Sequence, residues 1–157
     1  MDIKGKNMKV EIVERNEIII GGFSVETTLE NSVKDTEKLY SDFENSKMEI
    51  LNSFTQNTKE YYAVLWYTKL HESYRYLVGQ KIPNELCDFE VKVLPKGLYA
   101  YSKFPKDYDG IKAWTEFYQA GIPGTGYKPK EKDDIAFEYY PNGLNGEYEL
   151  WSLVEKI

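Results

Sequence analysis

The sequence predicts an α+β fold, in which two β-α-β-β units related by a pseudo-twofold axis share one antiparallel sheet. Runs of β-branched and aromatic residues alternate with two segments of helical periodicity, and the second set of elements follows the order of the first. The two hairpins begin at Tyr61 and Asp134, and the two helices begin at Ser32 and Asp109, so the two separations along the chain nearly agree. Such similar offsets indicate an internal repeat, and a ligand cleft is expected between the halves.

Length and composition fit one domain. A chain of 157 residues can bury roughly two-thirds of the surface that it exposes when unfolded. Hydrophobic residues make up 41% and charged residues 29%, so the chain is neither disordered nor fibrous. No linker rich in proline or serine interrupts it. We therefore expect a single domain over residues 1–157, with a first half at about 8–82 and a second half at about 86–157.

Charge, hydropathy and the lack of certain motifs argue against several classes of partner and cofactor. With 20 Lys and Arg against 26 Asp and Glu, the net charge of -6 opposes a phosphate backbone, so we expect no direct nucleic-acid binding. The sequence has neither the apolar core of a signal peptide nor the ~18 apolar residues of a membrane span, which predicts a cytoplasmic protein without membrane contact. Cys87 and His71 are single, and no glycine-rich phosphate loop occurs, so we expect no metal and no cofactor.

The first half is predicted to contain two strands, a helix and a hairpin. The strands lie at 9–13, 18–27, 61–68 and 74–82, and the helix lies at about 32–46. Residues 14–17 predict a turn or bulge between the first two strands. Asn31 and Ser32 offer a helix cap, and Asp35 is placed to complete a capping box. The helical pattern leaves open an extension to Phe54.

The second half repeats this order. Its strands are predicted at 87–94, 98–104, 134–140 and 147–155, with a turn at 95–97 and a helix capped by Asp109. The segment from Gly121 to Gly126 contains one proline and three glycines, which predicts the end of that helix. The charged segment 128–134 is expected to be a solvated loop.

One acidic residue on a predicted strand is the main candidate for chemistry. The period of two places Ile135, Phe137 and Tyr139 on one face and Ala136, Glu138 and Tyr140 on the other. If both faces are covered, the Glu138 carboxylate lies in apolar surroundings, where a bound cation would offset the cost of its ionisation. If one face is open, Glu138 is an ordinary solvated strand residue. The sequence leaves both interpretations open.

The chain is rich in aromatic residues. It has 14 Tyr, 7 Phe and 3 Trp, and the run at 61–67 is aromatic on both faces. Trp66 belongs to this run, whereas Trp114 and Tyr118 share one stripe of the second predicted helix. Each aromatic side chain taken alone is typical of core packing. Their number, beside an excess of carboxylates, favours a site for a flat or cationic small molecule, with Trp66 and Tyr118 in its lining.

Several motifs occur in a characteristic order along the chain. They are Tyr61-Tyr-Ala-Val-Leu-Trp-Tyr, Tyr74-Arg-Tyr-Leu-Val-Gly, Gly97-Leu-Tyr-Ala-Tyr-Ser, Trp114 with Tyr118, Gly126-Tyr127, Phe137-Glu-Tyr-Tyr, and Glu149 in the closing strand. Together they resemble the effector-binding domain of AraC-type and MerR-type bacterial transcription activators, also called the gyrase-inhibitor-like small-molecule-binding domain. The resemblance covers nearly the whole chain, and the duplicated architecture of that family agrees with the repeat predicted above.

This resemblance implies a cleft that binds lipophilic, often cationic small molecules, in drug sensing or sequestration. Glu138 matches the charged centre, Trp114 and Tyr127 match family motif positions, and Tyr99 and Tyr140 are further expected pocket residues. Activators of the family carry a helix-turn-helix domain for transcription regulation. No residues remain here for such a domain, so we expect a stand-alone effector-binding protein.

Two other functions stay open from the sequence. Glu138 acting as a general base, with Tyr127 or Tyr99 donating a proton, would hydrolyse electrophilic small molecules. Alternatively, an acidic surface would bind a protein partner, as the gyrase-inhibitor name of the family suggests. The chain departs from the family at Tyr40, where many members carry a tryptophan, and at Leu150-Trp-Ser-Leu-Val in the last strand. These departures bear on the identity of the ligand more than on the fold.

Overall fold

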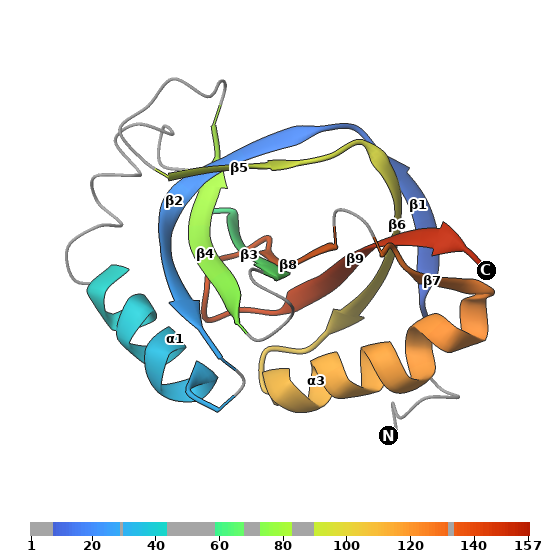
Figure 1. The fold of residues 1–157 in the computed structure, drawn as a ribbon. Helices are drawn as coiled ribbons and strands as arrows, with labels where there is room; N and C mark the ends of the chain where they lie inside the picture. The colour runs from blue at the N-terminus through green and yellow to red at the C-terminus, as the bar shows by residue number, and fades with distance from the viewer. Residues whose placement is uncertain (1–7, 29, 44–58, 68–72, 83–89, 132–133) are drawn as a thin grey trace.

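A computed structural model describes residues 8–28, 30–43, 59–67, 73–82, 90–131 and 134–157. These residues form an antiparallel sheet with two α-helices packed against it, which confirms the predicted α+β class (Figure 1). The strands are β1 (Glu11–Arg15), β2 (Ile18–Thr27), β3 (Tyr61–Tyr67), β4 (Tyr74–Lys81), β5 (Glu90–Leu94), β6 (Gly97–Phe104), β7 (Tyr127–Pro129), β8 (Ile135–Tyr140) and β9 (Tyr148–Lys156), and the helices are α1 (Ser32–Asp42) and α3 (Gly110–Glu116).

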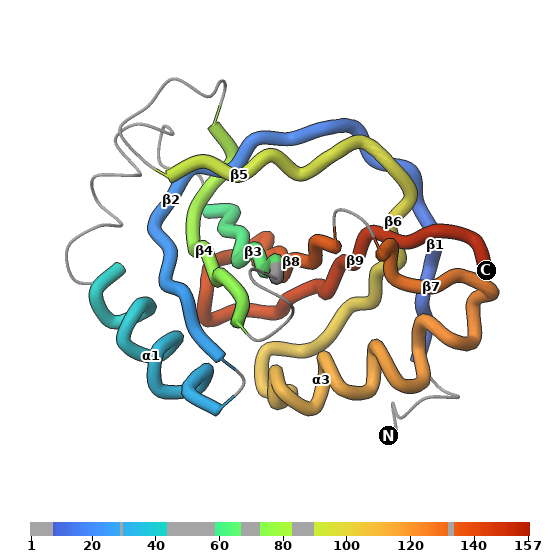
Figure 2. Tube along the Cα trace, in the orientation of Figure 1, coloured from blue at the N-terminus to red at the C-terminus, as the bar shows by residue number. Residues whose placement is uncertain are grey.

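The sheet is closed by a long two-stranded ribbon. Its strands are hydrogen-bonded in the order β1-β6-β9-β8-β3-β4-β2-β5, and β7 pairs with β9. β1 and β2 pair with β6 and β5 in one register, which runs from Glu11 opposite Tyr101 to Gly22 opposite Glu90. Because β2 also pairs with β4 and β6 also pairs with β9, this ribbon joins the two ends of the order. The strands therefore curve round a common interior (Figures 1 and 2).

Alternating side chains of the strands fill three buried clusters. The cluster inside the sheet contains Phe137 and Trp151, whose rings stack with centroids 5.8 Å apart. The guanidinium of Arg15 lies 4.4 Å from the centre of the Trp151 ring. A second cluster lies between the sheet and α3 around Phe117, and a third lies between the sheet and α1 around Phe43. The residues of β8 from Ile135 to Glu138 are buried, so both faces of this central strand are covered.

The two helices lie on the same side of the sheet. Their N-terminal ends approach one another, and the two helix axes diverge from that point (Figure 2). Residues from the first turns of both helices and from the centre of the sheet together line the candidate site.

The two helix caps differ. The predicted cap of α3 is confirmed, because the Asp109 carboxylate accepts from the Lys112 amide at 3.2 Å. At α1, Asn31 occupies the cap position without a side-chain hydrogen bond. The predicted capping box is wrong, since the Asp35 carboxylate instead accepts from the Thr27 hydroxyl at 2.7 Å. The Asp35 carboxylate therefore bonds to the Thr27 hydroxyl at the end of β2, and not to a backbone N–H at the start of α1 as a capping box would require.

The helical run after α3 goes further than the glycines and proline predict. It continues as a π-helical turn, Phe117–Gly121, and a 3-10 turn, Ile122–Thr125. Pro123 is tolerated because it lies in the first turn of the 3-10 segment, where its missing N–H removes no helical hydrogen bond. The run ends at Gly126, whose φ of 82° suits a residue without a side chain.

Other predicted boundaries need correction. β1 extends through Arg15, so residues 14 and 15 belong to the strand and not to the expected turn. The segment 128–134 is not all loop, because Tyr127–Pro129 form β7 and pair with β9. The predicted helix beyond residue 43, the start of the predicted strand at 87–94, and the positions of Cys87 and His71 lie outside the described residues.

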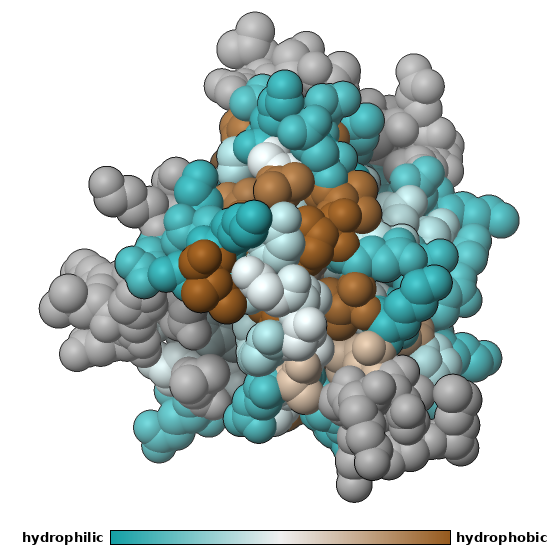
Figure 3. All heavy atoms as spheres, turned by 90° about the vertical axis from the view of Figure 1, so that its right-hand side faces the viewer, coloured by the Kyte–Doolittle hydropathy of each residue, from teal (hydrophilic) through white to brown (hydrophobic). Residues whose placement is uncertain are grey.

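The surface shows two further features. On the face that carries the C-terminus, apolar side chains gather in the middle and hydrophilic ones surround them (Figure 3). The C-terminal Ile157 is exposed. Within the ranges that the structure describes, we find no helix with the length and apolar character needed to cross a bilayer.

The close contact of β2 with β4 generates a testable prediction. Gly22 lies opposite Gly79, and a Cβ atom added at Gly22 would lie 2.1 Å from the carbonyl oxygen of Val78. We expect Gly22→Ala to destabilise the fold by about 3 kcal/mol, or to lower the melting temperature by roughly 6 to 12 °C, because backbone atoms must move apart. Gly124→Ala is the matched control, since a Cβ atom at Gly124 meets nothing within 4 Å. Equal melting temperatures for the two variants would contradict the prediction.

Candidate ligand-binding site

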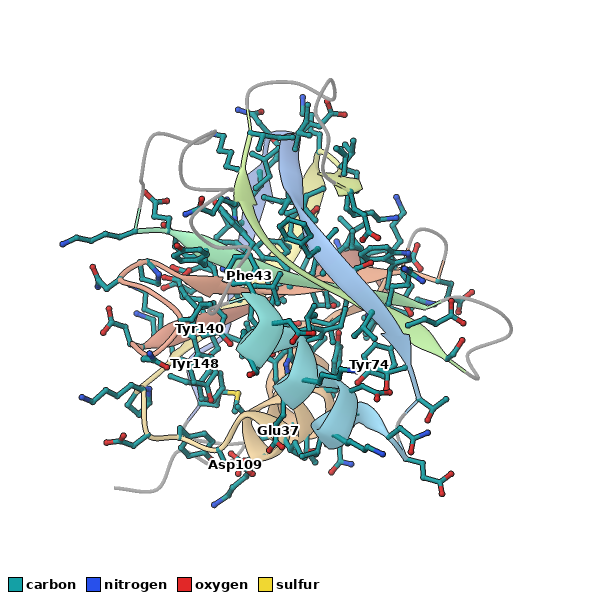
Figure 4. All side chains as sticks on the ribbon, turned by 90° about the vertical axis from the view of Figure 1, so that its left-hand side faces the viewer. Glu37, Phe43, Tyr74, Asp109, Tyr140 and Tyr148 are labelled. Carbon is teal, nitrogen blue, oxygen red and sulfur yellow. The ribbon has the colours of Figure 1, made fainter. Side chains whose placement is uncertain are left out.

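A cavity of about 500 Å³ lies between the two helices and the helix-facing side of the sheet. Its lining includes Val33, Glu37 and Tyr40 from α1, Leu65, Tyr76, Glu138 and Tyr140 from the strands, and Ile111 and Trp114 from α3. A second cavity of about 440 Å³ adjoins it and shares Trp114. Viewed from the α1 side, Glu37 lies on the helix, with Tyr140 to one side and Tyr74 to the other (Figure 4).

The side chain of Glu138 is the centre of the first cavity. It lies in β8, between β3 and β9, and is only 8% exposed. Tyr76 and Tyr140 donate their hydroxyl protons to Oε1 at 2.9 and 2.5 Å, and Trp114 donates its ring N–H to Oε2 at 2.7 Å. Among the described residues, no lysine or arginine forms an ion pair with this carboxylate. Of the two interpretations of Glu138, the buried one therefore applies.

A further tyrosine connects α1 to this carboxylate. The hydroxyl oxygens of Tyr40 and Tyr76 lie 2.6 Å apart. Because Tyr76 has one hydroxyl proton and donates it to Glu138, Tyr40 is the donor to Tyr76. Tyr40 thus links α1 to the carboxylate through one intermediate hydroxyl, and Trp114 links α3 to it directly.

The tyrosines around the carboxylate are strongly held in their neutral form. Burial raises the pKa of Tyr76 and of Tyr140 well above the ordinary value of 10.0, and the charge of Glu138 raises both pKa values further. Both hydroxyls therefore remain protonated at neutral pH. They act as hydrogen-bond donors and carry no charge that would repel an anion or attract a cation.

Aromatic and aliphatic side chains make up much of the remaining lining of the two cavities. The rings of Trp114 and Tyr118 stack, with centroids 5.6 Å apart and planes 16° apart. Trp66 and Tyr118 both line the second cavity. Val33 and Ile111, from the first turns of the two helices, are 51% and 62% exposed and belong to the lining of both cavities. Two apolar side chains thus lie at the mouth, beside the exposed side chain of Glu37.

Most of the site residues predicted from the sequence line one of the two cavities, and two do not. Glu138, Trp114 and Tyr140 line the first cavity, and Trp66 and Tyr118 line the second. The structure does not bring the remaining two to either cavity.

Tyr99 belongs to the cluster inside the sheet, donates to the carbonyl oxygen of Pro95 at 2.7 Å, and has a pKa that burial raises to about 12. Tyr127 packs in the cluster beneath α3 and forms the start of β7. Both residues stabilise the fold at a distance from Glu138.

Sequence reasoning missed the role of Tyr40 and Tyr76. Tyr40 entered only as a departure from a family pattern, and Tyr76 only as part of a motif. Alternation gives the face on which Tyr76 lies but not which strand neighbours it, so its contact with a residue 62 positions away was beyond the pattern. Neighbouring charge offered no clue either, because the donors to Glu138 within the described part of the chain are neutral.

The described residues contain no candidate metal site. Within the described ranges, no group of three His, Cys, Asp or Glu side chains is placed to hold a metal ion.

The chain belongs to the Cass2 family of integron-associated effector binding proteins, whose family model matches residues 11–152.

Two curated relatives share part of the sequence. A DNA gyrase inhibitor of Yersinia enterocolitica is 41% identical over 63 residues, which are 39% of this chain and 39% of the relative. A DNA gyrase inhibitor of Serratia proteamaculans is 38% identical over 55 residues, which are 34% of each chain. The matches thus span well under half the length of these relatives.

Solved structures share the fold over nearly the whole chain. SAV2435 bound to tetraphenylphosphonium has a TM-score of 0.70 at 12% identity and covers 94% of each chain. An integron cassette protein from the mobile metagenome of Vibrio cholerae has a TM-score of 0.64 at 17% identity, covering 93% of this chain and 95% of that one. The C-terminal domain of EcmrR has a TM-score of 0.60 at 12% identity, covering 96% and 99%. At these identities the likeness establishes the fold alone.

The raised tyrosine pKa values predict the response to alkaline pH. A tyrosine whose folded pKa exceeds its unfolded value keeps its full contribution below about pH 10, and that contribution is lost as the pH rises through the folded pKa. We expect the free energy of unfolding to fall above pH 10. In Tyr140→Phe the fall between pH 8 and pH 11 should be smaller by about 1.4 kcal/mol in total.

Urea unfolding between pH 8 and pH 11 measures this slope. Tyr140→Phe also removes the hydrogen bond to Glu138, so its stability is lower at pH 8, and only the change with pH tests the prediction. An alkaline slope equal to that of the wild type would contradict it.

Proposed function

We propose that this protein binds a lipophilic, aromatic or cationic small molecule between its two helices, with Glu138 as the charge partner, in an effector-sensing or sequestering role. One observation carries the proposal: a buried carboxylate faces an aromatic cavity, and its donors among the described residues are neutral. Such a carboxylate costs free energy to bury, and a cation in the cavity offsets that cost through its charge.

The hydrogen bonds around Glu138 leave room for a ligand. An ionised carboxylate offers about four acceptor positions, and the described donors fill three of them. The open position is on Oε2, beside the Trp114 indole. A cation there would meet the carboxylate among the aromatic side chains of the lining, and carboxylates and aromatic rings are two groups that attract organic cations in proteins.

The comparisons support the same ligand class. SAV2435 was solved with tetraphenylphosphonium, a lipophilic aromatic cation, and shares this fold. The family to which the chain belongs consists of effector-binding proteins.

The strand order supports the proposed duplication. One proposed unit contains β2, α1, β3 and β4, and the other contains β6, α3, β8 and β9. In the sheet, the strands of the second unit lie in the order first, third, second (β6-β9-β8). The strands of the first unit follow in the reverse order, second, third, first (β3-β4-β2). The separation along the chain between the starts of β3 and β8 equals that between the starts of β4 and β9. We propose a pseudo-twofold axis between β3 and β8. The cavity then lies between the helices of the two units, which is the cleft between the halves that the sequence predicts.

Binding is favoured over the two other functions. Hydrolysis by Glu138 with Tyr127 or Tyr99 requires one of these tyrosines beside the carboxylate, and neither lines its cavity. The gyrase-inhibitor relatives match only 39% and 34% of this chain, so an interaction with a protein partner has narrower support than the cavity does.

A titration with tetraphenylphosphonium tests the proposed role of Glu138. Binding is followed by tryptophan fluorescence, since Trp114 lines the cavity. Glu138→Gln keeps the shape but removes the charge, and we expect at least about tenfold weaker binding, or 1.4 kcal/mol. The control Glu131→Gln removes an equal charge from an exposed side chain and should bind as the wild type does.

Thermal melting of each variant checks that the fold is retained. The amide nitrogen of the glutamine would meet the indole N–H of Trp114, donor against donor, so a modest fall in melting temperature is expected for Glu138→Gln. A folded Glu138→Gln variant that binds tetraphenylphosphonium with unchanged affinity would rule out the charge role of Glu138. Accumulation of a product beyond one equivalent per protein, with an electrophilic substrate, would favour the hydrolase instead.

A further inference from the structure

The cavity contains a second carboxylate that the proposed function does not use. Glu37 lies on α1 and lines the same cavity as Glu138. It is exposed, whereas Glu138 is buried, so one carboxylate lies at the rim and the other at the base. Glu37 was not among the residues that sequence patterns single out, because an exposed acidic residue on a helix is usually a solvated one.

The helical spacing of α1 places Glu37 in line with the hydroxyl chain to Glu138. Glu37 and Tyr40 are three residues apart and therefore occupy the same side of the helix. The Tyr40 hydroxyl is 2.6 Å from that of Tyr76, which is 2.9 Å from Oε1 of Glu138. One helical turn, the Tyr40 side chain and the Tyr76 hydroxyl thus lie between the two carboxylates, which places them on the order of 10 Å apart.

The charges of the cavity have one sign. Glu37 and Glu138 are its charged lining residues, and no lysine or arginine belongs to the described lining. Lys34 and Lys38, the neighbouring lysines on α1, do not line it, and neither forms an ion pair with Glu37 among the described residues.

The helix N-termini at the mouth do not reverse this sign. A free helix N-terminus would favour an anion. At α3 that end is capped by Asp109, whose carboxylate accepts from the Lys112 amide, and the first turn of α1 contains Asp35. Both positive ends therefore already have a carboxylate.

We infer that Glu37 is a second cation-binding position and that the cavity selects molecules with two cationic groups, one at Glu138 and one about 10 Å away at the rim. The inference rests on the proposed function, because it requires the first cationic group to bind at Glu138. Since Glu37 is exposed and screened by solvent, its contribution is modest, and we expect a dication to bind about three- to fivefold more tightly than a monocation of equal shape.

Two isosteric probes isolate the second charge. Each carries a triphenylphosphonium group and an alkyl chain of four to eight methylene groups. One chain ends in a trimethylammonium group and the other in a neutral tert-butyl group of the same shape. The measured quantity is the ratio of the two dissociation constants in the wild type, in Glu37→Gln and in Glu30→Gln, a control that removes an equal charge from an exposed residue outside the cavity lining.

The expected result is a preference of about three- to fivefold for the dication in the wild type and in Glu30→Gln, and a ratio near one in Glu37→Gln. The preference should peak at one chain length and decrease in high salt. A ratio near one in the wild type would overturn the inference while leaving the proposed function intact, provided that both probes bind more weakly to Glu138→Gln.

Two other outcomes would also overturn the inference. A preference that survives Glu37→Gln but is lost in Asp134→Asn would assign the second position to the adjoining cavity, which Asp134 lines. Failure of both probes to bind the wild type would overturn the proposed function together with this inference.

Discussion

The arrangement of the helices depends on one buried carboxylate. Glu138 must be hydrogen-bonded because it is almost completely removed from water, and its donors come from three different elements. Trp114 holds α3 to it, Tyr76 and Tyr140 come from the sheet, and Tyr40 adds α1 through Tyr76. The need to satisfy a single charged group therefore sets where both helices meet the sheet. The same need leaves the cavity lined by aromatic side chains and free of basic ones among the residues that the structure describes.

The cavity and the core depend on opposite faces of the same strands. Phe137 points into the closed interior of the sheet, where it stacks on Trp151, and the next residue, Glu138, points toward the helices. Packing on one face holds the strand rigid, which gives the carboxylate on the other face a fixed position. A site built on a central strand with both neighbours paired needs little reorganisation to receive a ligand.

Local patterns predicted the elements well but their contacts poorly. The strand Ile18–Thr27 followed from its β-branched residues, the face of Glu138 from period-two alternation, and the Asp109 cap from its position. Asp35 was assigned to a capping box because the pattern contains no information on the hydroxyl of Thr27 beside it. Tyr99 and Tyr127 carried family motifs but pack away from the cavity, whereas Tyr76 reaches it. Strand order decides which tyrosines surround a carboxylate, and strand order is a property of the whole chain.

The two-stranded ribbon also bears on how the chain folds. Residues as distant in sequence as Glu11 and Tyr101 are paired in it, because β1 near the N-terminus pairs with β6. The N-terminal strand β1 cannot reach its partner β6 until the middle of the chain has been made. Contacts so distant in sequence slow folding, because a long loop must close before any of them forms. We therefore expect the sheet to form in one cooperative step of milliseconds to seconds.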